Sequence, residues 1–67
     1  MLKKGTRVVV VDEKMAQERS ANVRNGDKGT IVEEEENGDY GVMMEEDRDF
    51  VGAPWWLPVS SVMKEPA

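Results

Sequence analysis

Short apolar runs separated by glycines predict strands rather than helices along most of this chain. The strongest run covers residues 7–12, where four valines follow one another, and β-branched side chains suit the pleated surface of a sheet. An unbroken apolar run is typical of a strand covered on both faces, as in a small curled barrel. A second strand is predicted at 28–35, where alternation places Ile31 and Glu33 on the same face.

A tight hairpin is predicted where Asn37 and Gly38 separate the second strand from the stretch at 40–45. The Asn-Gly pair tolerates the positive φ angles that a two-residue hairpin turn requires. The second and third strands are therefore expected to pair antiparallel.

The remaining segments are shorter. Residues 55–57 predict a fourth strand bounded by prolines, which cannot donate hydrogen bonds to a sheet. Residues 58–61 fit a tight turn or one turn of 3₁₀ helix, and 62–64 fit a last strand. Between the first two strands, 12–23 has too thin an apolar stripe for a long helix, so we expect a long loop with at most one helical turn.

Most large apolar side chains are needed for the core. A domain of 67 residues buries only about 60% of the surface that its unfolded chain exposes, so an exposed apolar residue is a candidate contact. We expect the core to contain Val8, Val10, Ile31 or Val32, Val42 and one tryptophan.

Three motifs carry a resemblance to a known fold. Residues 4–10 (KGTRVVV) are similar to the x-G-x-x-V-x-V start of many SH3-like barrels, including KOW-type translation and transcription modules. Residues 26–32 (GDKGTIV) are similar to their G-x-x-G-T-V-V entry to the second strand, and 56–62 to their closing w-x-P-x-x-x-V stretch. The chain thus resembles the SH3-like barrel superfamily, which implies an all-β, five-stranded barrel with a long first loop and a short 3₁₀ turn before the last strand. One domain is expected over 1–67, with its core at about 3–64 and a frayed tail at 65–67.

Composition excludes several classes of protein. The chain has no Cys and no His, so it lacks the ligands of most zinc sites, disulfides, and thiol or imidazole catalysis. We expect no catalytic residues, no metal, no cofactor and no small-molecule substrate. No apolar run reaches about 18 residues, the length of a membrane span, and no signal peptide pattern opens the chain. A cytoplasmic protein without a membrane partner is the expectation.

Charge divides the chain into two parts. Residues 1–28 carry seven bases and four acids, whereas 29–67 carry two bases and ten acids, and the net charge is -5. Most of the acids lie on and beside the predicted hairpin. They either solvate its edge and prevent pairing with other chains, or form a face for a basic partner.

The leading hypothesis is a non-enzymatic binding or adaptor module that docks on a protein partner through its aromatic closing strand and acidic hairpin. Because Trp55 and Trp56 are adjacent in a strand, they point to opposite faces, and one of them is expected outside. One version is a phage or accessory regulator whose acidic face imitates a row of phosphates in the basic groove of a host nucleic-acid enzyme. The candidate partner-binding residues are Trp55, Trp56, Phe50, Tyr40, Glu45, Glu46 and Asp47.

The alternative is a KOW-like nucleic-acid-binding module that uses the basic first loop. Arg19, Arg24 and Lys28 flank that loop, and neutralisation of phosphates supplies much of the affinity of such modules. The acidic half of a domain this small lies within one or two Debye lengths of these bases, which favours the protein partner.

Overall fold

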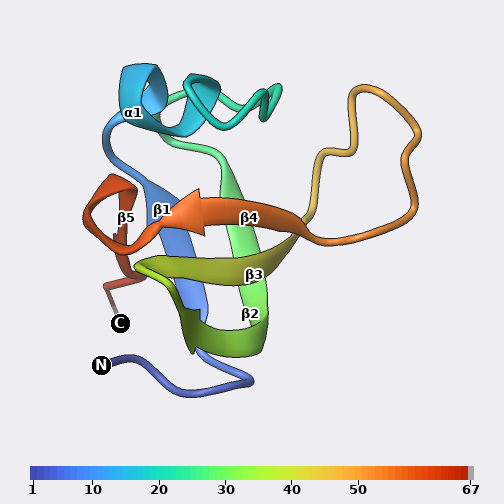
Figure 1. The fold of residues 1–67 in the computed structure, drawn as a ribbon. Coiled ribbons are helices and arrows are strands. Elements are labelled where there is room, and N and C mark those ends of the chain that lie inside the picture. The colour runs from blue at the N-terminus through green and yellow to red at the C-terminus, as the bar shows by residue number, and fades with distance from the viewer. Residues whose placement is uncertain (67) are drawn as a thin grey trace.

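Five antiparallel strands form one curled sheet in a computed structural model, which describes residues 1–66 (Figure 1). The strands are β1 Arg7–Val10, β2 Lys28–Glu36, β3 Asp39–Met44, β4 Trp55–Pro58 and β5 Val62–Lys64. Their order in the sheet is β4-β3-β2-β1-β5. The predicted all-β fold with five strands is confirmed, although β4 and β5 remain the two edges and the sheet is not closed.

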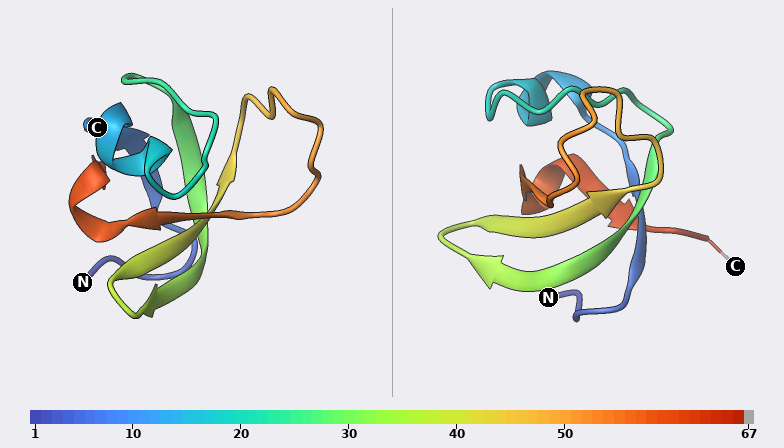
Figure 2. Two further views of the ribbon diagram at one scale, coloured as in Figure 1. Left: turned by 45° about the horizontal axis from the view of Figure 1, so that its top comes forward. Right: turned by 90° about the vertical axis from the view of Figure 1, so that its right-hand side faces the viewer.

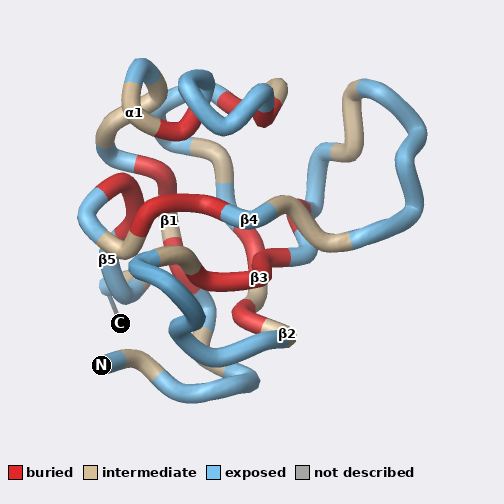
Figure 3. The backbone as a smooth tube through the Cα atoms, in the orientation of Figure 1, coloured by how far each residue is buried: buried red, intermediate tan, exposed pale blue. Residues whose placement is uncertain are grey.

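The core lies inside the curve of the sheet (Figure 3). Val8, Val10, Ile31, Val42 and Leu57 are fully buried there, and Trp55 is partly buried against them. The predicted core valines are therefore confirmed, and Ile31 rather than Val32 supplies the contribution of β2.

A short helix, α1 Glu13–Gln17, follows β1, and the predicted loop with one helical turn is confirmed. The predicted first strand reached Asp12, but β1 ends at Val10. Asp12 instead caps α1, since its Oδ1 accepts a hydrogen bond from the Met15 amide at 3.1 Å, which satisfies one of the free amides of the first turn. The 3₁₀ turn is also confirmed, as η1 Val59–Ser61 directly before β5.

The hairpin turns at Asn37 and Gly38, as predicted, with φ angles of 55° and 87°. Above the turn, the pairing of β2 with β3 is irregular, with register shifts between Ile31 and Glu33 and between Glu33 and Glu36. The prediction that Ile31 and Glu33 share a face is wrong, because the shift between them reverses the alternation. Ile31 points into the core, while Glu33 is exposed.

Glu33 lies opposite Gly41, and Gly41 lies opposite Trp56 on the next strand. A Cβ on Gly41 would come within 2.8 Å of the Glu33 Cβ, so both residues face the same way. We call this side, turned away from the core, the outer face of the sheet.

Pairing extends beyond the last strand, because the Glu65 amide donates to the Arg7 carbonyl at 2.9 Å. The tail predicted to fray at 65–67 thus begins with a bonded residue, and Ala67 lies outside the described residues. Within residues 1–66, no helix is long and apolar enough to cross a membrane.

Candidate functional site

The structure assigns opposite roles to the two tryptophans. Trp55 lies opposite the buried Val42, and Trp56 lies opposite Gly41. Because neighbouring side chains of a strand alternate between faces, Trp55 packs against the core and Trp56 stands on the outer face, where it is 39% exposed.

Trp56 forms one wall of an open pocket of about 250 Å³. The other walls come from the end of β2, the turn and the start of β3: Glu36, Asn37 and Asp39. We call this site the Trp56 pocket. It combines an indole ring, an amide and two carboxyl groups.

The two carboxyl groups of the Trp56 pocket differ in their surroundings. Arg19, in the loop after α1, donates from Nε to Asp39 Oδ2 at 3.1 Å and from Nη2 to Asp39 Oδ1 at 3.3 Å. These hydrogen bonds and the negative charge of Asp39 raise the pKa of Arg19. Glu36 makes no ion pair within 4 Å with any described residue, so its charge is left for solvent or a ligand.

Phe50 lies at the opposite end of β3, in the loop at 45–54 that joins β3 to β4, here called the Phe50 loop. This loop projects from the sheet, away from the hairpin turn (Figures 1 and 2). Phe50 is 92% exposed and adopts a φ of 53°, a conformation that is unfavourable for a bulky side chain.

Asp47 fixes the shape of the Phe50 loop. Its carboxylate accepts hydrogen bonds from the amides of Val51 at 2.9 Å and Gly52 at 2.7 Å. These bonds lower the pKa of Asp47, because they stabilise its charged form. A residue predicted to contact a partner thus has its carboxylate engaged within its own loop.

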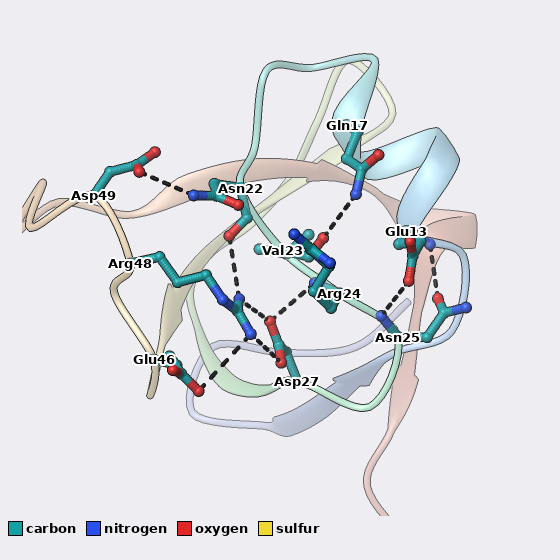
Figure 4. A network of polar contacts seen from close by, with 10 residues as sticks. All are labelled: Glu13, Gln17, Asn22, Val23, Arg24, Asn25, Asp27, Glu46, Arg48 and Asp49. Carbon is teal, nitrogen blue, oxygen red and sulfur yellow. Dashed lines mark hydrogen bonds and ion pairs between the residues drawn. The ribbon is translucent and has the colours of Figure 1, made fainter.

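The base of the Phe50 loop is tied to the first loop by polar contacts (Figure 4). Arg48 forms a two-pronged ion pair with Asp27, with 3.1 Å between Nη2 and Oδ1, and Asp49 accepts from the Asn22 side chain at 2.9 Å. The hydrogen bonds from Arg48 are the main reason that the pKa of Asp27 is lowered. Two loops far apart in sequence are thereby held side by side.

Other predicted partner contacts are already engaged. Tyr40 does not join an exposed aromatic patch: it is 3% exposed, because it lies opposite Leu57 on the inner face, and its hydroxyl accepts from the Leu2 amide at 2.9 Å. Glu45 pairs with Arg7, and Glu46 lies 3.8 Å from Arg48.

Two of the three bases proposed to bind nucleic acid are each paired with a carboxylate of this chain. Arg19 is bound to Asp39 as described above, and Lys28 Nζ lies 2.9 Å from Glu65. Arg24 has no ion pair within 4 Å among residues 1–66. Of these three bases, two are therefore compensated by carboxylates of this chain.

The residues that line the pocket beside Trp56 share no motif in the sequence. Glu36 belongs to a run of acids and Asn37 is a turn residue, and they meet Trp56 because the hairpin turn lies beside β4 in the fold. No three acidic side chains among residues 1–66 come close enough together to hold a metal ion. Comparisons of the chain with protein-family models, curated proteins and solved structures find no match.

Proposed function

We propose that this chain is a small SH3-like barrel that acts as a non-enzymatic adaptor and docks on a protein partner through the Trp56 pocket. The strand order β4-β3-β2-β1-β5, with η1 just before the last strand, supports the SH3-like assignment that the motifs suggest. The absence of His and Cys from the sequence supports binding over catalysis, because these residues are common acids, bases and nucleophiles in enzymes.

The outward position of Trp56 is the observation that carries the proposal. A domain this small has few apolar side chains to spare from its core, yet it holds an indole ring on the outer face beside polar groups. Tryptophan is enriched among the residues that dominate binding energy at interfaces. The acidic residues around it favour a partner with a basic surface, since complementary charge speeds association and selects partners.

Phe50 provides a second apolar contact at the other end of β3. A six-residue antiparallel strand is about 17 Å long, and a standard interface buries roughly 800 Å² on each partner. One protein partner is therefore large enough to reach both Trp56 and Phe50.

A nucleic-acid partner is less well supported. Arg19 and Lys28 are already paired with carboxylates of this chain, so binding phosphates there would require those ion pairs to be broken or shared. Most nonspecific affinity for nucleic acid comes from uncompensated Lys and Arg.

A nuclease-controlled capture experiment tests the proposal. Tagged wild type, Trp56→Ala and Met63→Ala are each incubated with lysate before and after nuclease treatment. Met63 is the control because it is an exposed apolar residue on the edge strand β5, far along the sheet order from β4. We expect a protein that survives nuclease treatment, is retained by Met63→Ala, and is lost with Trp56→Ala.

The nucleic-acid alternative predicts a different pattern. In that case nuclease treatment releases the captured material, Arg24→Gln abolishes a gel shift at about 0.15 M salt, and Trp56→Ala has no effect. That pattern contradicts the proposed function.

A further inference from the structure

We propose that the Trp56 pocket binds the side chain of an arginine in a basic segment of the partner, an inference that rests on the docking role proposed above. The guanidinium group would stack on the Trp56 indole and donate hydrogen bonds to the Glu36 carboxylate. Three observations support this: the size of the pocket, the side chains that line it, and the binding of the Arg19 guanidinium group to Asp39 in its wall.

The size favours one side chain over a small-molecule ligand. The pocket has a volume of about 250 Å³ and is open to solvent, whereas sites for drug-sized ligands and cofactors usually occupy about 300–1,000 Å³ and enclose most of the ligand. An extended peptide that crosses the hairpin end of the sheet presents single side chains of suitable size.

The lining selects a planar cation. The face of an indole ring attracts cations, and arginine is the cation found there most often. Arginine also offers a fork of N–H donors that matches a carboxylate. The Trp56 pocket supplies both an indole and the carboxylate of Glu36, which has no ion pair among the described residues.

Arg19 is the independent observation that points to this ligand. Its guanidinium group binds Asp39 through two nitrogens, at 3.1 and 3.3 Å, on one wall of the same pocket. Asp39, one of the two carboxylates that line the pocket, therefore already binds a guanidinium group through both of its oxygens. The second carboxylate, beside Trp56, offers the same kind of partner to an incoming arginine.

The test is an NMR titration of the ¹⁵N-labelled full chain with three blocked pentapeptides, each holding one central residue between glycines. The central residue is arginine, lysine or citrulline, and citrulline keeps the shape of arginine without its charge. A spectrum of Trp55→Phe assigns the Trp56 indole N–H. We expect the arginine peptide to shift this signal and the amides of Glu36, Asn37 and Asp39, with a Kd in the millimolar range, about 1–10 mM.

Two variants and a matched control locate the binding. We expect Trp56→Leu, which keeps an apolar side chain but removes the indole face, to weaken arginine binding about fivefold. Glu36→Gln should weaken it about threefold. Glu34→Gln makes the same change of charge on the same strand, outside the pocket lining, and should leave the Kd within about 1.5-fold. The amide spectrum of each variant confirms that it is folded.

Three results would overturn the inference. The first is an unchanged Trp56 indole signal up to about 20 mM arginine peptide. The second is an equal response to the arginine and citrulline peptides, which would exclude recognition of charge. The third is equal weakening by Glu34→Gln and Glu36→Gln, which would indicate a diffuse field rather than a site. If any of these occurs while protein capture still depends on Trp56, the inference fails and the proposed docking function stands.

Discussion

The run of valines at 8–11 should show a stability cost that depends on whether each side chain is buried. Val8 and Val10 are each 1% exposed, whereas Val11 is 45% exposed. Replacing a buried valine with alanine removes two carbon atoms, at about 0.8 kcal/mol each, or roughly 1.6 kcal/mol. An incompletely collapsed cavity adds to this value, so we expect Val8→Ala and Val10→Ala to cost about 1.5–3 kcal/mol each.

Val11→Ala is the matched control, since it makes the same chemical change one residue away from a buried position. Val11 holds its place through its main chain, with its amide donating to the Ser61 carbonyl at 2.8 Å, and alanine keeps that bond. We therefore expect a cost within about 0.5 kcal/mol. A domain of this size has a total stability of only about 3–10 kcal/mol, so the difference in unfolding free energy between Val10→Ala and Val11→Ala will be a measurable fraction of the total.

Urea unfolding followed by tryptophan fluorescence measures these changes, because Trp55 packs against the core. The slope of the free energy against urea should stay constant, which would show that the variants differ in stability and not in the surface exposed on unfolding. Equal losses for Val10→Ala and Val11→Ala, or a larger loss for Val11→Ala, would refute the placement of Val10 in the core and of Val11 at the surface.

Three further predictions address the hairpin, the outer face and the loop anchor. Gly38→Val should destabilise by about 1 kcal/mol or more in the same assay, because φ is 87° at this position; an unchanged midpoint would contradict the turn. Gly41→Ala should cost about 1–3 kcal/mol by overpacking against Glu33, and Glu33→Gly should restore part of that loss. Because Arg48 lowers the pKa of Asp27 in the folded state, its stabilisation is present above the unfolded value of about 3.9 and is lost as the pH falls through the folded pKa. Asp27→Asn should therefore show a shallower loss of stability on acidification below about pH 4 than wild type.

The strands were predictable because their signals are local. The valines at 8–11 and the Asn37–Gly38 pair each determine the backbone within a few residues, and β1 and the hairpin turn form where these signals place them, although β1 ends at Val10. The register shift beyond Ile31 was not predictable, because alternation assumes regular pairing and the sequence carries no sign of where the register changes. Because of this shift, the Glu33 side chain lies on the outer face of the sheet and not on the inner face with Ile31.

The polar contacts were missed for a related reason. Asp27 and Arg48 are 21 residues apart, and nothing near either residue indicates that they meet. The distribution of charge along the chain predicts that Glu45 and Asp47 contact a partner, whereas in the fold Glu45 pairs with Arg7 and Asp47 accepts hydrogen bonds from loop amides. A carboxylate that the sequence predicts to be free for a partner can instead bind a distant part of its own chain once the protein folds.

Phe50 offers a test of whether the projecting loop is adapted to binding at the expense of stability. A φ of 53° costs a residue with a bulky side chain roughly 1 kcal/mol or more, and Phe50 is too exposed to recover that cost by burial. Asparagine tolerates this conformation, so Phe50→Asn should raise the free energy of unfolding by up to about 1 kcal/mol. If Phe50 is the second docking contact, the same variant should weaken binding to the partner captured through Trp56, mainly by faster dissociation. The same substitution is then stabilising and functionally costly, as expected where a binding residue is held in a strained conformation. A Phe50→Asn variant that is less stable than wild type would show that the loop does not hold this residue in the left-handed conformation.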